Sequence, residues 1–144
     1  MNIPDLQAFA GRHPLLLLAL AGLTIAIVIN ELATLFRGFK GLGPAALTAL
    51  VNRDNALVVD LRPQADFEKG HIPGSRNVQM SQFDPENKQL VAARALPVVL
   101  VCKSGQTSSA AATRLRKAGF EHVYVLDGGI GAWQAADLPL AKGR

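Results

Sequence analysis

A single long apolar run near the N-terminus most limits how this chain can fold. Within residues 15–29, only Gly22 and Thr24 interrupt a series of leucine, alanine, isoleucine and valine. The apolar character resumes two residues later, so residues 15–36 form one 22-residue segment. As a helix this segment measures about 33 Å at ~1.5 Å per residue, which is enough to cross a ~30 Å hydrocarbon core. The run therefore divides the chain into a membrane segment and a remainder that folds in water.

Three interpretations of this run compete. A cleaved signal peptide requires a basic start and a small-residue cleavage site, whereas this chain begins Met-Asn-Ile-Pro-Asp and offers only a poor site near Ala33. A core helix of a soluble domain requires polar residues on one face, and residues 15–29 show no such face. We therefore expect an uncleaved transmembrane helix over residues 15–36, after a short tail of residues 1–14 and before a linker of residues 37–41.

The charges on either side of this helix favour one orientation. Arg12 and the amino terminus precede it and are partly offset by Asp5, whereas three basic residues follow it before the first acidic residue, Asp54. Basic residues concentrate on the cytoplasmic side of membrane helices. The margin is one or two charges, and it favours a cytoplasmic C-terminal part.

Composition excludes several classes of function for the remainder. The chain has 15 Lys and Arg against 11 Asp and Glu, a net charge of +4, and these residues are scattered. With one Trp and one Tyr, it has neither the dense basic surface nor the aromatic residues typical of a nucleic-acid-binding protein. The single cysteine excludes an internal disulfide and any metal site built from cysteine pairs, and the three histidines are dispersed. We expect no nucleic-acid partner and no metal.

Residues 42–144 show the pattern of one α/β domain. Short apolar runs predict strands at residues 56–61, 97–101 and 123–126, with a brief strand at residues 77–78. Helical spacing and turn residues predict helices from residue 44, within residues 62–69, and at residues 86–95 and 108–118. Strands that alternate with helices form a parallel sheet with helices on both faces.

The reactive chemistry concentrates around the single cysteine. Cys102 directly follows the most apolar strand, at the end of a parallel sheet where ligands bind. Gly105 allows a turn with positive φ that lets backbone N–H groups converge, the next helix starts there, and Lys103 adds a full charge. These features favour the thiolate, so we expect the pKa of Cys102 to lie below its ordinary value. The other interpretation of Cys102 is a small, buried and inert hydrophobic residue.

Spacing alone argues against one related chemistry. Cysteine phosphatases hold the phosphate of their substrate with an arginine six residues after the cysteine. That position is Ser108 here, and the nearest arginine, Arg114, lies well inside the predicted helix. Hydrolysis of phosphate esters is therefore not expected.

Several motifs, in order along the chain, resemble those of a known family. They are VVDLR at residues 58–62, DFEKGHIPGSRNV at 66–78, the Cys102 loop, AGF at 118–120 and VYVLDGGIGAW at 123–133. Together they resemble the single-domain rhodanese-like sulfurtransferases over residues 42–140. The implied fold is a rhodanese-like α/β domain whose parallel sheet is flanked by helices on both faces. One transmembrane helix ahead of such a domain is similar to small membrane-anchored bacterial proteins, which implies a single pass of the bacterial inner (cytoplasmic) membrane.

The resemblance implies a covalent reaction at Cys102. The thiolate attacks the outer sulfur of a small donor such as thiosulfate, and a thiol acceptor then removes that sulfur from the resulting persulfide. Residues 102–107 have the loop length of sulfurtransferases, whereas related phosphatase-type loops are one residue longer. Thr107 stands where many family loops carry arginine, and the choice between thiosulfate and mercaptopyruvate stays open. No cofactor is implied. The residues implied to bind the substrate are Lys103, Ser104, Gly105, Gln106, Thr107 and Ser108.

Other conspicuous side chains are expected to be structural. Asp60 and Arg62 are expected to fix a strand end beside the site, His71 to hold a loop, and Trp133 to pack the last helix onto the sheet.

A second function also fits this chain, namely a non-catalytic binding or sensing module that recruits an unknown protein partner to the lipid bilayer. The intact cysteine favours sulfur transfer, and a thiol that must stay reduced fits a cytoplasmic domain.

Overall fold

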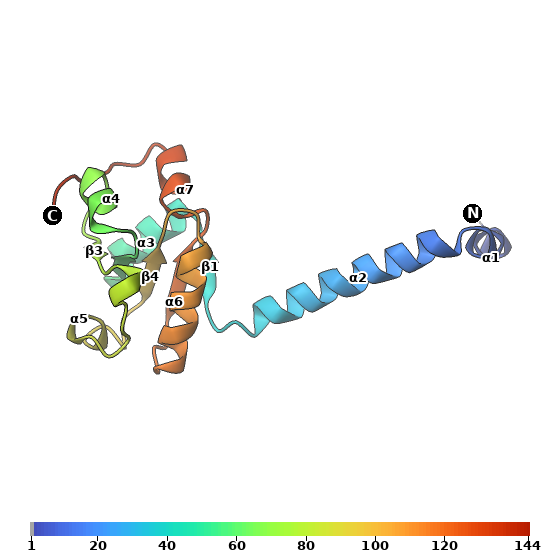
Figure 1. The fold of residues 1–144 in the computed structure, drawn as a ribbon, viewed down its shortest axis with the longest axis horizontal. Coiled ribbons are helices and arrows are strands. Elements are labelled where there is room, and N and C mark those ends of the chain that lie inside the picture. Colours follow the sequence, from blue (N-terminus) through green and yellow to red (C-terminus); the bar gives the residue numbers. More distant parts are fainter. Residues whose placement is uncertain (1) are drawn as a thin grey trace. The chain divides into compact units, whose positions relative to one another are not determined.

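A computed structural model describes residues 2–144 as two compact units, residues 2–37 and Gly38–Arg144 (Figure 1). The first unit consists of helices α1 (Ile3–Arg12) and α2 (Pro14–Leu35). His13 separates them, because its backbone leaves the helical region at φ −132° and ψ 59°. Pro14 then opens α2 at a position where its missing N–H costs no hydrogen bond.

Helix α2 is long and apolar enough to cross a membrane. It has 22 residues and a mean hydropathy of 2.3 over its most apolar stretch. None of its residues is buried against other parts of the described chain. By length and composition α2 is therefore a candidate membrane span, although a signal sequence near an N-terminus has the same properties.

Residues 1–14, expected from the sequence to be a tail, include the ten-residue helix α1. A proline lies in its first turn, and several of its residues are strong helix formers, namely Leu6, Gln7, Ala8 and Ala10. So short a segment gives too few helical repeats for periodicity alone to distinguish a helix from a tail.

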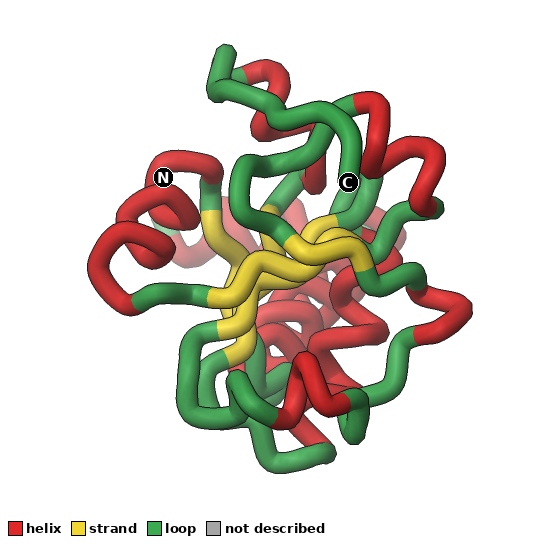
Figure 2. Tube along the Cα trace, turned by 90° about the vertical axis from the view of Figure 1, so that its left-hand side faces the viewer, coloured by secondary structure: helices red, strands yellow, loops and turns green. Residues whose placement is uncertain are grey.

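The second unit is built on a five-stranded parallel sheet (Figure 2). Its strands are β1 (Lys40–Leu42), β2 (Leu57–Asp60), β3 (Arg76–Asn77), β4 (Val98–Val101) and β5 (Val123–Leu126), in the order β1-β5-β4-β2-β3. In the parallel register, Val99 of β4 lies beside Val58 of β2 and Tyr124 of β5. All four residues of central β4 are 0% exposed. This burial explains the uninterrupted valine and leucine run, since a strand covered on both faces has no side for polar residues.

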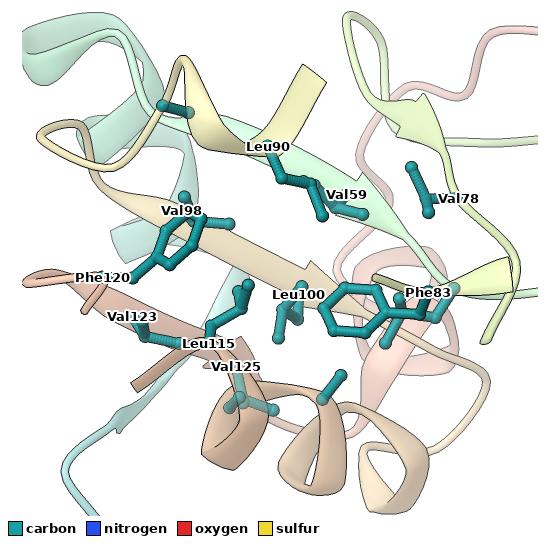
Figure 3. Close-up of a cluster of buried hydrophobic side chains, with 14 of the residues drawn as sticks. Val59, Val78, Phe83, Leu90, Val98, Leu100, Leu115, Phe120, Val123 and Val125 are labelled. Atoms are coloured by element: carbon teal, nitrogen blue, oxygen red, sulfur yellow. The ribbon is translucent and has the colours of Figure 1, made fainter. Parts of the chain in front are cut away.

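Helices cover both faces of this sheet. They are α3 (Pro44–Asp54), α4 (Gln64–Lys69), α5 (Lys88–Val91), α6 (Gln106–Lys117) and α7 (Gly129–Ala135), with one 3₁₀ turn, η1 (Met80–Gln82). Side chains of α3 and α7 pack with Val99 and Val101 on one face. Side chains of α5 and α6 pack with Val98 and Leu100 on the other (Figure 3). The predicted fold class, a parallel sheet with helices on both faces, is confirmed.

The edge strand β1 corrects one boundary. Lys40 and Gly41, which the sequence places in the linker of residues 37–41, pair with Tyr124 and Val125 of β5. The ladder ends where the Asp127 N–H donates to the carbonyl of Leu42 at 2.9 Å. A strand of three residues is too short to show apolar alternation. It is therefore recognised only in the structure, by its pairing with the edge of β5.

Two helix boundaries also differ from those predicted. Helix α5 covers only Lys88–Val91 within the expected residues 86–95, and the Asn87 side chain caps it by accepting the Gln89 N–H at 3.0 Å. Helix α6 begins at Gln106, two residues before the expected start, because Gly105 caps it with a φ of +98°.

The pairing of β1 predicts a stability difference between two fragments. A fragment of residues 38–144 should exceed one of residues 43–144 by about 2–4 kcal/mol in the free energy of unfolding, since the shorter one loses ladder hydrogen bonds of ~1 kcal/mol each and the packing of Leu42. Urea denaturation followed by circular dichroism measures the difference. The control is Leu42→Ala in the longer fragment, which keeps the ladder and should lose less. Equal stability of the two fragments would show that β1 adds nothing.

Candidate active site

Cys102 is the first residue after β4, and its position is set by the sheet. Its side chain is only 4% exposed and belongs to the core on the α6 face. Directly after it, residues 103–105 form a tight turn that ends at Gly105, whose φ of +98° suits glycine. Helix α6 then starts at Gln106, so the cysteine lies at the N-terminal end of a helix, as expected from the sequence.

The Cys102 sulfur is surrounded by hydrogen-bond donors. The Gly105 N–H donates to Sγ over 2.9 Å, and Oγ of Ser108 lies 3.3 Å from Sγ. The Ser108 side chain is 0% exposed, and its hydroxyl has the Gly105 carbonyl, at 3.1 Å, as a second acceptor. Because a thiolate can only accept, the Ser108 hydroxyl donates to Sγ when the cysteine is ionised.

These contacts lower the pKa of Cys102. Burial acts to raise the pKa of the thiol, but hydrogen bonds from the Ser108 hydroxyl and from the N–H groups of Ser108, Gly105 and Ser104 outweigh it. The lowered pKa predicted from the sequence is thus confirmed. The contribution expected from Lys103 is not among its causes, since that side chain is exposed and its charge is screened by water.

The turn after β5 clamps the backbone of the cysteine. The Ile130 N–H donates to the Cys102 carbonyl over 2.9 Å. Gly129, with a φ of +60°, lies so close that a Cβ there would collide with the carbonyl of Cys102 and, at 2.7 Å, with the backbone of Lys103. A glycine is therefore required at 129 for a spatial reason that its place in the DGG sequence does not reveal.

Asp60 and Arg62 fix the end of the neighbouring strand β2. Nη2 of Arg62 lies 2.7 Å from Oδ2 of Asp60, and its Nε lies 3.0 Å from Oδ1. Nη2 also donates to the Gly70 carbonyl at 2.8 Å. The Asn77 amide donates to the carbonyls of Asp60 and Arg62, at 3.1 and 2.9 Å. Asp60 is 1% exposed, and the pair ties the end of β2 to Gly70, the residue after α4, while Asn77 ties β3 to the same backbone.

A cleft of about 320 Å³ opens beside Cys102. The turn contributes Lys103, and α6 contributes Thr107, whereas Arg62 comes from the segment that follows β2. No sequence pattern predicted the part of the wall that comes from the segment around η1, namely Gln79, Met80 and Ser81. Polar side chains in a loop give no local signal of the cleft that they line. A second cavity of about 260 Å³, with Lys69 and Gln134 in its wall, shares Arg62 and Lys103 with the first.

The structure separates the six predicted substrate-binding residues into three groups. Lys103 and Thr107 line the cleft. Ser104, Gly105 and Ser108 instead contact the cysteine sulfur. Gln106 is exposed at the start of α6, outside the lining of the cleft.

The other candidates from the sequence lie away from this cleft. His71 is 5% exposed, with Nδ1 2.8 Å from the Phe67 carbonyl and its ring stacked on Phe67 at 3.7 Å. Its backbone pairs with Ala141, which gives it a structural role. Trp133 packs α7 onto the sheet and donates from Nε1 to the Pro139 carbonyl at 2.9 Å. Across residues 2–144, no three His, Cys, Asp or Glu side chains are grouped to hold a metal ion.

Known proteins are similar to this chain in sequence and in fold. Residues 43–136 match the family described as rhodanese-like domain. The chain is 37% identical over 141 residues to the uncharacterized protein YibN of Escherichia coli (strain K12), covering 97% of this chain and 99% of that one. It is 35% identical over 103 residues to thiosulfate sulfurtransferase GlpE of Pseudoalteromonas translucida (strain TAC 125), covering 68% of this chain and 91% of that one.

A solved structure agrees with this similarity. The crystal structure of thiosulfate sulfurtransferase from Pseudomonas aeruginosa superposes with a TM-score of 0.64 at 31% sequence identity. The match covers 72% of this chain but only 19% of that chain, so the chain spans about a fifth of that protein.

The contact between Ser108 and Cys102 predicts a change in thiol reactivity. Ser108→Ala removes a hydrogen bond that lowers the pKa of Cys102, so the pKa should rise and alkylation by iodoacetamide near neutral pH should slow several-fold. The pH dependence of the alkylation rate, followed by mass spectrometry, measures the shift. Ser109→Ala is the matched control, because the Ser109 hydroxyl bonds the Gly105 carbonyl and not the sulfur. An unchanged pH profile in Ser108→Ala would rule out this role.

Proposed function

The chain belongs to the family of rhodanese-like domains, and from this premise we propose that it is a membrane-anchored sulfurtransferase whose sulfur carrier is Cys102. The observation behind the proposal is the environment of the sulfur. A lowered pKa makes Cys102 a nucleophile, and the N–H of Gly105 points at the atom that would bear the transferred sulfur.

The proposed reaction has two balanced steps. The Cys102 thiolate attacks the outer sulfur of a donor such as thiosulfate, the S–S bond of the donor breaks, and sulfite leaves with the electron pair. A thiolate acceptor then attacks the outer sulfur of the cysteine persulfide and takes it, which restores the Cys102 thiolate. No external oxidant or reductant is consumed. Gly105 and Ser108 donate the hydrogen bonds that lower the pKa of the thiol. The same hydrogen bonds stabilise the Cys102 thiolate, which attacks in the first step and is restored in the second.

The charges of the cleft fit an anionic donor. Arg62 and Lys103 are the two cations in its wall. Arg62 is neutralised by its pair with Asp60, whereas Lys103 forms no salt bridge within the described chain. Lys103 is thus proposed to attract the anionic end of the donor, and the Thr107 hydroxyl to add a neutral hydrogen bond.

The proposed anchor is helix α2. Its 22 apolar residues match the thickness of a bilayer. The similarity to YibN over 97% of this chain extends through this segment, whereas the similarity to GlpE covers only 68% of the chain. We place the catalytic unit on the cytoplasmic side of a bacterial inner membrane. The larger number of basic residues after α2 favours this side, and the reducing environment there keeps a single thiol reduced.

One observation favours a second function, a binding or sensing module. Cys102 is only 4% exposed, which leaves little of the sulfur open to a donor. In that case the rhodanese-like unit recruits a protein partner to the membrane, and Cys102 reports the redox state or plays no part.

Intact-mass spectrometry of the fragment of residues 38–144 separates these two functions. Thiosulfate should add one sulfur atom to the wild-type fragment, and cyanide should remove it, because the persulfide sulfur is electrophilic. The Cys102→Ser fragment is the control and should gain nothing. A folded wild-type fragment with a reduced thiol that gains no sulfur from thiosulfate or mercaptopyruvate would favour the binding module.

The proposed role of Lys103 predicts a specific kinetic change. Lys103→Ala should raise the KM for thiosulfate about tenfold, the equivalent of ~1.4 kcal/mol, and should leave kcat nearly unchanged, because the lysine contacts the donor and not the reacting sulfur. Steady-state thiocyanate formation measures both constants. Lys117→Ala, at the far end of α6, is the matched control for the loss of one exposed positive charge. An unchanged KM in Lys103→Ala would refute the role.

A further inference from the structure

Helix α1 has its large apolar side chains on one side. These side chains recur every three or four residues, which places them within a sector of roughly 120° on a helix that turns ~100° per residue. They are Ile3, Leu6 and Phe9, and the small Ala10 lies in the same sector. Asp5 and Arg12 are seven residues apart and share a different sector. The helix is therefore amphipathic.

This apolar side has no partner within the described chain. Ile3 is 75% exposed, Leu6 51% and Phe9 49%, and no residue of α1 is buried. A helix of ten residues is marginal in water by itself, because so few hydrogen bonds barely offset the cost of starting the helix. A surface that covers the apolar side would stabilise it.

The chain connection restricts which surface α1 can meet. His13 alone separates α1 from α2. The non-helical backbone of His13 ends α1 and allows the chain to change direction before α2 begins. If α2 spans a bilayer, the C-terminal end of α1 lies within one residue of the membrane boundary. A continuation of α1 through the hydrocarbon would bury Asp5 and Arg12, which is costly.

We infer that α1 binds the membrane surface and lies in the headgroup region with Ile3, Leu6 and Phe9 against the acyl chains. The inference rests on the proposed membrane anchor and extends it to a second lipid contact. A helix with an apolar sector, a few charges and exposed large side chains is typical of interfacial segments. Arg12, in the last turn, lies close to the lipid phosphates in this arrangement.

Fluorescence quenching in vesicles tests this inference on the full chain. In a Cys102→Ser background, single substitutions Leu6→Cys, Ala8→Cys and Leu23→Cys are labelled with bimane and reconstituted in phosphatidylcholine and phosphatidylglycerol. Ala8 is the matched control, because two residues rotate the helix by ~200° and place it opposite Leu6. Leu23, near the middle of α2, reports on the anchor. The two quenchers are brominated acyl chains, and iodide on both sides of the membrane.

The expected result is that lipid quenches the label at residue 6, iodide quenches that at residue 8, and lipid alone quenches that at residue 23. Iodide quenching of both residue 6 and residue 8, with residue 23 in lipid, would overturn the inference and leave the anchor intact. Lipid quenching of both α1 positions would show an embedded helix and also overturn it. Protection of residue 6 from both quenchers would indicate a protein partner and overturn it as well. A label at residue 23 that iodide reaches would reject the anchor, and the inference with it.

Discussion

The hydrogen bond from the Gly105 N–H to the Cys102 sulfur is the contact on which the rest of the site depends. It forms because Gly105 adopts a φ of +98°, which ends the turn after β4 and starts α6. The same start of α6 brings the Ser108 hydroxyl to the sulfur. Gly129 lets the turn after β5 approach the backbone of Cys102 and Lys103. Gly105, Ser104 and Ser108 therefore create the electrostatic environment of the thiol, and Gly129 allows the close backbone packing behind it.

The two units place different physical demands on the chain. In the second unit, apolar side chains are removed from water by packing on both faces of a sheet, with β4 buried between two cores. In the first unit, no side chain of α1 or α2 is buried, so the same stabilisation must come from outside the described chain. In the proposed arrangement a bilayer supplies it for both helices, through the hydrocarbon for α2 and the interface for α1. Sulfur transfer would then take place close to a membrane surface.

Much of the fold followed from local patterns. Apolar runs located β2, β4 and β5 to within two residues at either end, because strands buried in a parallel sheet need apolar residues throughout. The strand–cysteine–glycine order indicated the turn, the helix and the lowered pKa of Cys102. The elements that were missed are β1 and η1, with three residues each, and the ten-residue helix α1. Such segments contain too few side chains to show a period, and their conformation depends on what they pack against.

The amino-acid sequence by itself determined the division into an apolar helix and an α/β unit, the parallel sheet, and the position of the single cysteine at the end of β4. Only the tertiary structure decided which hydrogen-bond donors lower the pKa of Cys102, and that the segment around η1 forms part of the wall of the cleft. The physical reason is the distance along the chain over which each kind of interaction acts. Periodicity and backbone preference act between neighbours along the chain, whereas hydrogen bonds, close approaches and screening depend on distances between residues that only folding brings together.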